Sequence, residues 1–503
     1  MKQVICKVVC ICLIVMCIFS LSIHSNAASN GSLSESVLWK LEDGCLTISG
    51  TGEIPSSPTP PWYDQRKNII SIVIEEGIVG IGSQTFQYCS AATSIQLPNS
   101  LAYIGSHAFL GCARLGNISI PAGIRRIEDF TFANCASLRQ ISLPDTVKHI
   151  GSHAFLGCEN LTSIDLPSAI NNIESFAFWG CKKLESIRLP DAVTTVKQGL
   201  FLECETLSSV VLSPQTTEIA QDAFSGCAVL EAISLPDTLT ELGSNAFYGC
   251  ASLKEIVISD GVDQLPDSAF AGCTALESVA LSPATVWINR GVFADCTSLR
   301  SISIPATLQR IEGNAFLNCS NLTAVYITDI AAWCHTSFDI GSNPLHNGAD
   351  LYLNGEPVVD LILPDEVGYI NSHVFAGCRS IRSVVFPEGL IAIYNHAFEN
   401  CENLSQITLP STLNTVSTDA FHRCHNLTQV NYSGSLQQMQ SISIGQRNDP
   451  LTNVQWQYST VEMAKGIALM IVTEVLPVVL PYLLFQGAAI VIIFVLESRR
   501  RRI

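Results

Sequence analysis

The chain has 503 residues, of which 48% are apolar, only 14% are charged and 20 are cysteines, and its formal net charge is −17. The apolar content is too high for a disordered chain, and the acidic balance excludes a sequence-independent nucleic-acid binder, which needs basic patches. Removing the two terminal segments described below leaves a net charge of about −21, which also disfavours contact with anionic lipid.

Residues 1–28 have the pattern of a secretory signal peptide. Lys2 lies near the start, an apolar stretch covers 8–23, and small residues follow at Ala27 and Ala28. A basic start, an apolar centre and a small-residue end are the features that direct export and cleavage. We therefore expect cleavage after Ala27 or Ala28, with an uncleaved membrane anchor as the alternative.

Residues 29–67 are expected to cap the array that follows. Leu38, Leu41, Leu46 and Ile48 alternate with polar residues and turn-forming residues, which predicts a hairpin. The end of a stacked array exposes unpaired strand edges and apolar core, so an atypical first unit is needed to cover it.

A 23-residue repeat organises most of the chain, in two blocks at 68–319 and 367–429. Eleven cysteines from Cys89 to Cys319 follow one another at steps of 23, and Cys378, Cys401 and Cys424 resume the same step. A phenylalanine lies three residues before each of these 14 cysteines. A fixed period of this length is typical of a solenoid, in which each unit stacks on its neighbours.

The repeat reads LxxIxLPxxLxxIGxxAFxGCxx, and residues 230–252 are a clean copy. The IxL alternation predicts a short strand that the proline ends, and AFxGC predicts one helical turn closed by glycine. Stacked units place equivalent apolar side chains over one another and so bury them. The predicted inward column includes Phe155, Cys158, Phe178, Cys181, Phe247 and Cys250.

The cysteine column allows two interpretations. An exported chain with many cysteines can be a disulfide framework. Here each thiol occurs once per repeat at a position marked as buried, and pairing neighbours would require alternate repeats to differ, which they do not. The pattern therefore favours a ladder of reduced, buried thiols that pack as small apolar groups.

The period breaks at residues 320–366. Cys378 follows Cys319 by a step of 59 residues, 13 more than two regular steps of 23. The additional residues fall around 333–354. A structural wedge between two repeat blocks is the favoured interpretation, and a protruding binding element is the alternative.

The predicted outward strand positions flank the inward isoleucine of each IxL segment. They are mostly small and polar, as at Asn117, Ser163 and Ser301, which suits a broad contact with an extended ligand. Arginine and tyrosine dominate binding hot spots, so Arg188 and Tyr326 are the strongest candidates on this face, and Glu255 lies on it too. These three residues are the predicted ligand-binding set.

The C-terminal part predicts a membrane anchor. Residues 430–458 are expected to form a second cap and 459–474 a linker. Residues 475–496 are long and apolar enough to cross about 30 Å of hydrocarbon as a transmembrane helix. Four arginines in the tail 497–503 mark the cytoplasmic side. We therefore expect a single-pass protein of the cell membrane, with the solenoid outside and the C-terminus in the cytoplasm.

The repeat closely resembles the BspA-like leucine-rich repeat. The resemblance covers about residues 33–458 and includes three segments outside the regular repeats: LWKLEDGCLTISGTGEIP with PWYDQRKNIISIVIEEGIVGIG, VYITDIAAWCHTSFDIGSNPLHNGADLYLNGEPVVDLILPDEV, and VNYSGSLQQMQSISIGQRNDPLTNVQWQY. It implies a curved leucine-rich-repeat solenoid of parallel short strands and helical turns. It also implies a surface protein that adheres to host matrix proteins or to other cells.

No catalytic or metal-binding set is predicted. His107 and His153 lie two repeats apart, too far to share a metal ion. His373 and His396 occupy the same position in adjacent repeats, where a hydrogen-bonded edge is favoured over a weak metal site. Cys334 and His335 are neighbours in the chain, so their side chains rarely face each other. We expect no enzyme activity and no cofactor.

The sequence leaves two functional classes open. The first is a membrane-anchored adhesin that binds an extracellular protein or glycan, and not nucleic acid. The second is a spacer or self-associating surface-layer protein without a specific ligand.

Overall fold

The computed structural model describes residues 29–458, which fall into two compact units. The first unit covers residues 29–300 with 315–321, and the second covers 301–314 with 322–458. No helix between residues 29 and 458 combines the length and hydropathy needed to cross a bilayer. The expected signal peptide (1–28), linker (459–474), transmembrane helix (475–496) and tail (497–503) lie outside the described residues.

The first unit begins with the predicted hairpin. Strands β1 (Ser29–Ser32), β2 (Val37–Glu42) and β3 (Cys45–Gly50) pair antiparallel in this order. On β2 the buried side chains are Val37, Trp39 and Leu41, whereas Leu38 is 53% exposed. Leu38, one of the four apolar residues from which the hairpin was predicted, therefore lies on the outward face of β2. A 3-10 helix, η1 (Tyr63–Asn68), precedes the first regular coil.

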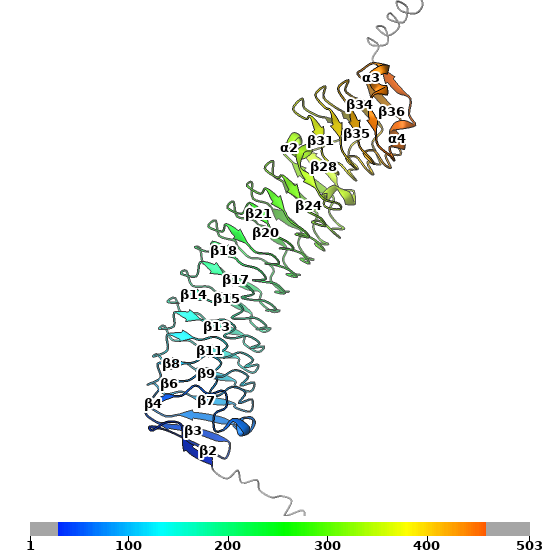
Figure 1. The fold of residues 1–503 in the computed structure, drawn as a ribbon. Coiled ribbons are helices and arrows are strands. Elements are labelled where there is room, and N and C mark those ends of the chain that lie inside the picture. Colours follow the sequence, from blue (N-terminus) through cyan, green and yellow to red (C-terminus); the bar gives the residue numbers. More distant parts are fainter. Residues whose placement is uncertain (1–28, 459–503) are drawn as a thin grey trace, which may run out of the picture. The chain divides into compact units, whose positions relative to one another are not determined.

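The IxL segments form the first strand column, in which each strand pairs in parallel with its equivalent one repeat away (Figure 1). Residues 23 apart face each other, as in the pair Ile141 and Ile164. In the first unit this column contains β5 (Ser71–Ile74), β7 (Ser94–Gln96), β9 (Asn117–Ser119), β11 (Gln140–Ser142), β13 (Ser163–Asp165), β15 (Ser186–Arg188), β17 (Ser209–Val211), β20 (Glu255–Val257) and β22 (Ser278–Ala280). Residues 232–234, in the cleanest sequence copy, form no strand, although Ile233 is still buried.

A second strand column uses the apolar residue that precedes each GS or equivalent dipeptide. Its strands are very short and also parallel, as in the pair Ile127 and Ile150. In the first unit they are β4 (Gly52–Ile54), β6 (Ile78–Ile81), β8 (Tyr103–Ile104), β10 (Arg126–Ile127), β12 (His149–Ile150), β14 (Asn172–Ile173), β16 (Thr195–Val196), β18 (Glu218–Ile219), β19 (Glu241–Leu242), β21 (Gln264–Leu265) and β23 (Trp287–Ile288).

The AFxGC segments, which we expected to form one helical turn, form linked tight turns instead. In the coil at 105–112, the N–H of Cys112 donates to the carbonyl of Phe109, whereas the N–H of Phe109 donates to Thr131 in the next coil. His107 and Gly111 both have left-handed backbone angles, with φ of 61° and 73°. Alternate N–H groups thus leave the turn, and the two left-handed residues prevent a continuous right-handed helix. We call this segment of each coil the turn ridge.

The core of the first unit consists of the predicted columns. Phenylalanine rings stack from coil to coil at centroid distances of 5.2–5.8 Å. Trp62 extends the stack toward the N-terminal hairpin and contacts Phe86 and Trp39. The predicted inward residues are all fully buried: Phe155, Cys158, Phe178, Cys181, Phe247 and Cys250.

The cysteine column is a ladder of free thiols. All 16 cysteines between residues 29 and 458 are unpaired, and those of the repeat column are buried. Twelve of the 14 column thiols donate a hydrogen bond to the carbonyl of the phenylalanine in the preceding coil, as from Cys158 to Phe132 at 3.2 Å; the exceptions, Cys89 and Cys378, begin the two blocks. The ladder is therefore apolar packing with a specific donor interaction, and the disulfide alternative has no counterpart here.

The second unit repeats the two strand columns. Its first column contains β24 (Ser301–Ile304), β26 (Ala324–Ile327), β28 (Asp350–Leu353), β30 (Asp360–Ile362), β32 (Ser383–Val385), β34 (Gln406–Leu409), β36 (Gln429–Tyr432) and β38 (Trp456–Tyr458). Its second column contains β25 (Arg310–Ile311), β27 (Ser337–Phe338), β31 (Tyr369–Ile370), β33 (Ala392–Ile393), β35 (Thr415–Val416) and β37 (Ser443–Ile444).

The insert is part of the coil and does not protrude as a separate element. It contains α2 (Ile330–His335), η2 (Pro344–Asn347) and the short strand β29 (Glu356–Pro357). Strand β27 pairs with β25 and β28 pairs with β26, so the insert continues both columns. Trp333 is only 2% exposed. These features agree with the wedge interpretation.

The last coil is closed by two short helices, α3 (Leu436–Gln440) and α4 (Asp449–Thr452). Asn448 is buried, and its side chain accepts from the N–H of Phe421 at 2.9 Å. It also donates to the carbonyl of Ser417 at 2.9 Å. One side chain therefore supplies the hydrogen bonds that another coil would otherwise provide.

Candidate functional site

The strand face is defined as the outward first and third residues of each strand in the first column. Most three-residue strands show an exposed, buried, exposed order, because successive side chains of a strand point to opposite sides. The exposed side chains are mainly serine, asparagine and glutamine in β7 to β13. Valines appear further along, at Val211 and Val257.

Arg188 lies fully on this face, as predicted. Its guanidinium is 3.8 Å from the carboxylate of Asp191, and both side chains are mostly exposed. Asp165 and Val211 occupy the equivalent positions in the preceding and following strands, and Arg188 is directly opposite Val211. Along the strand column, the basic Arg188 therefore lies between the acidic Asp165 and the apolar Val211.

A shallow hollow surrounds Arg188. It has a volume of about 820 Å³ and is lined by β13, β15, β17 and the loops that follow the first two strands. Polar lining groups include Ser163, Ser186 and Ser209. Three further hollows lie along the same face, beside residues 116–183, 208–234 and 210–238. Shallow hollows are therefore present along several coils of the face.

Glu255 is also exposed on the strand face, at the start of β20. It lies opposite Ser278 of β22 and next to Lys254, whose ammonium is 2.7 Å from the carboxylate of Glu231. Val257, two residues further on, is 67% exposed. This part of the face presents charged and apolar side chains, and none of the four hollows described above includes Glu255 or Val257.

Tyr326 belongs to the second unit and is half-buried. Its ring lies 4.8 Å from that of Tyr352, which is directly opposite it in the parallel pair β26 and β28. Pro357 of β29 pairs with Tyr352 on the other side. The predicted tyrosine is therefore one half of an aromatic pair.

Sequence reasoning missed Tyr352. It follows Tyr326 by 26 residues, so the 23-residue period does not place the two side by side. The strand-like LYLNGEP segment within the insert, with a turn at Asn354 and Gly355, carried the only indication that another strand of the column lay there.

The groups considered for chemistry are separated or buried. His107 and His153 are separated by Phe130, and the three rings form one stack on the turn ridge. Cys334 is fully buried, and burial raises the pKa of its thiol, which keeps it un-ionised at neutral pH. His335 instead lies 5.0 Å from the ring of Tyr369.

Solved structures resemble this architecture. A leucine-rich repeat protein from Bacteroides ovatus ATCC 8483 has 26% identity, with 85% of this chain and 99% of that chain covered and a TM-score of 0.58. A leucine rich cell surface protein from Faecalibacterium prausnitzii A2-165 has 24% identity, covers 82% of this chain and 97% of that chain, and has a TM-score of 0.35. The comparison with curated proteins gave no match.

The repeats also match a family model described as a BspA type leucine rich repeat region. The matched residues are 62–155, 125–250, 217–339 and 348–465, which together cover most of the chain. The expected resemblance is confirmed by this match and by the stacked parallel strands. This protein belongs to the BspA-type leucine-rich repeat family.

Proposed function

We propose that this protein is a membrane-anchored surface protein whose strand face binds an extracellular protein or glycan of a host or a neighbouring cell. The supporting observation is the run of small polar side chains and shallow hollows over residues 116–238, with Arg188 in the largest hollow described above. Such a surface suits an extended ligand, because each coil repeats similar donors and acceptors at about 4.8 Å intervals.

Two places on the face have the composition of binding hot spots. Arginine and tyrosine contribute disproportionately to interface energies. Arg188 supplies the first place, and the pair Tyr326 and Tyr352 supplies the second. The net charge of −17 opposes nucleic acid and anionic lipid as ligands.

The same proposal treats the protein as non-catalytic. The described strand-face hollows are lined by serines, charged residues and apolar residues, without a histidine or cysteine that could act as base or nucleophile. A serine needs an adjacent base to become nucleophilic, so Ser163, Ser186 and Ser209 serve as hydrogen-bonding groups in this proposal.

The test is a binding screen of residues 29–458 against host matrix proteins, mucins and bacterial surfaces, measured by biolayer interferometry. Loss of Arg188 or of the tyrosine pair is expected to weaken a saturable interaction by roughly tenfold or more. The variants are Arg188→Ala, Tyr326→Ala and Tyr352→Ala. Arg114→Ala and Tyr248→Ala, exposed residues outside the strand face, are the matched controls.

Equal effects of strand-face and control variants would argue against a site on this face. Failure to find any saturable ligand would favour the second candidate, a spacer or self-associating surface-layer protein. Light scattering of the same segment separates these outcomes, because self-association raises the apparent mass with concentration whereas a spacer remains monomeric.

A further inference from the structure

The turn ridge of the second unit carries a cluster of metal-ligating side chains outside the strand face. His373, His396 and Asp419 occupy equivalent positions in three consecutive coils, each with a left-handed backbone (φ 64°, 59° and 61°). Glu399 and His422 lie three residues after His396 and Asp419. The ridge therefore presents two adjacent columns of titratable groups.

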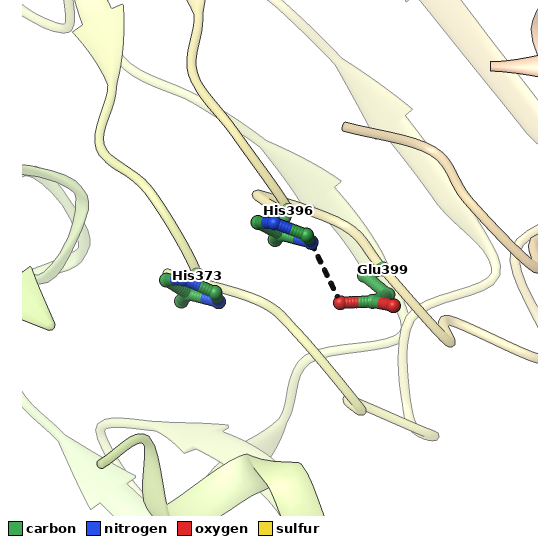
Figure 2. Close-up of side chains that lie close together, drawn as sticks. All are labelled: His373, His396 and Glu399. Atoms are coloured by element: carbon green, nitrogen blue, oxygen red, sulfur yellow. Dashed lines mark hydrogen bonds and ion pairs between the residues drawn. The ribbon is translucent and has the colours of Figure 1, made fainter. Parts of the chain in front are cut away.

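The side chains of three of these residues converge. Figure 2 shows the rings of His373 and His396 one above the other, with the carboxylate of Glu399 beside them. The ring centroids are 4.7 Å apart and the rings are almost parallel. His396 Nδ1 lies 2.9 Å from Glu399 Oε2, and one ligand atom from each of the three residues lies within 4.8 Å of the other two.

The backbone holds this arrangement across two coils. The N–H of His373 donates to the carbonyl of Asn395 at 3.1 Å, and the N–H of His396 donates to Thr418 at 3.3 Å. Metal–nitrogen and metal–oxygen bonds of about 2.0–2.2 Å would require the ligand atoms to draw closer by rotation of the side chains.

The charges around the cluster suit a divalent cation. Burial and the neighbouring His396 lower the pKa of His373, so its ring is neutral and has a free lone pair at neutral pH. Burial opposes ionisation of Glu399, but hydrogen bonds from His422 and His396 outweigh it and lower its pKa. Glu399 raises the pKa of His373 and His346 lowers it, but both effects are smaller than that of burial.

The next coil supplies further polar support. Asp419 is almost buried; its carboxylate lies 3.1 Å from Arg447 Nε and 3.9 Å from His396 Nε2. His422 Nδ1 contacts Glu399 Oε1 at 3.1 Å, so Glu399 is oriented from both sides. Hydrogen-bonded ligands of this kind are oriented more accurately and hold metal ions more tightly.

We propose that His373, His396 and Glu399 form a binding site for a divalent first-row transition ion, with solvent completing the coordination. Two imidazoles and one carboxylate are a donor set suited to zinc, nickel or copper. This site is independent of the strand-face ligand. The hydrogen-bonded edge favoured by the sequence is present, since His396 contacts Glu399 at 2.9 Å, and the metal site is proposed in addition to it. Bound metal would join two coils that are otherwise linked only by packing and hydrogen bonds.

The first test uses the full-length chain in detergent, with zinc titrated by calorimetry at pH 7.5. Wild type is expected to bind one equivalent more than His396→Ala, and Glu399→Gln is expected to weaken that equivalent by about tenfold or more. His153→Ala, from the same ridge position in the first unit, and His425→Ala, an exposed nearby histidine, should both retain it. Cobalt is the spectroscopic probe: its visible bands should appear without a thiolate charge-transfer band.

Binding should weaken on acidification, because protons compete with the metal ion for the imidazole nitrogens. Zinc should also raise the unfolding temperature of wild type but not of His396→Ala, since a ligand that binds only the folded state stabilises it. Each variant is first compared with wild type by circular dichroism without metal. A native-like His396→Ala with unchanged zinc stoichiometry, or a cobalt spectrum dominated by thiolate bands, would overturn the proposal.

Discussion

Each regular coil contributes one phenylalanine and one cysteine to the core, and the two are linked between coils. The thiol of Cys204 donates to the carbonyl of Phe178 at 3.2 Å, while the ring of Phe178 stacks on that of Phe201. A cysteine can occupy this position because it is small and apolar and still donates a weak hydrogen bond. The column therefore has no need of a disulfide partner.

Burial of these thiols predicts an alkaline loss of stability. Desolvation raises the pKa of Cys158 to about 12, and likewise that of Cys250. The un-ionised thiol stabilises the fold fully below its unfolded-state pKa of about 8.5. Above that value each such thiol loses about 1.4 kcal/mol of stabilisation per pH unit, until the pH reaches the folded-state value.

Urea unfolding of residues 29–458 at pH 7 and pH 10 measures this effect, and the midpoint should fall markedly at the higher pH. In the native state at pH 8 the column thiols should resist Ellman's reagent, whereas half-buried Cys45 should react. Rapid labelling of the column thiols in the folded protein would contradict the buried ladder.

The phenylalanine column should be sensitive to truncation. Phe201→Ala removes a fully buried ring from the middle of the stack and should destabilise the first unit by about 3–5 kcal/mol. Phe201→Leu fills part of the space and should cost less. Phe176→Ala, on the half-exposed ridge stack, is the control and should have a smaller effect. Urea unfolding followed by circular dichroism provides the comparison.

At the scale of elements, the insert preserves the columns by exchanging a regular turn for a short helix. Helix α2 places Trp333 in the core, and the segment after it returns in time for β27 and β28 to pair with the preceding coil. Because the strand pairing continues through the insert, the insert has a structural role. The same pairing also places Tyr352 beside Tyr326 on the strand face.

The start of α2 depends on one carboxylate. Asp329 accepts from the N–H groups of Ala331 and Ala332 at 2.9 and 3.0 Å. Asp329→Ala should therefore destabilise the insert by about 1 kcal/mol, while Asp329→Asn should retain most of the stability. Hydrogen exchange at residues 330–335 reports the change; equal exchange in both variants would mean that the cap contributes little.

At the scale of the whole molecule, stability should follow the register of the repeats. Each coil contacts mainly its neighbours, so the energy is close to a sum over coils and their interfaces. The apolar columns supply most of this energy, because surface ion pairs such as Lys254 with Glu231 add little stability. The fold therefore needs few charged residues.

Deleting one complete 23-residue repeat should therefore be tolerated, whereas deleting half a repeat should not. Removal of residues 159–181 joins Cys158 to Lys182 and restores the same repeat phase. Removal of 159–170 places apolar residues on the outer face and breaks both strand columns. Circular dichroism and thermal unfolding should show a folded protein for the first deletion and a largely unfolded first unit for the second.

The period, the inward phenylalanine and cysteine columns and the outward strand positions can all be predicted from the sequence, because identical spacing forces equivalent residues into register. Arg188 and Glu255 are exposed as expected for that reason. Tertiary structure decided what the period does not encode. Backbone hydrogen bonds between coils turned the expected helical segment into tight turns, and the insert placed Tyr352 beside Tyr326. The convergence of Glu399 on the two histidines likewise depends on the left-handed ridge geometry, which directs side chains three residues apart to one place.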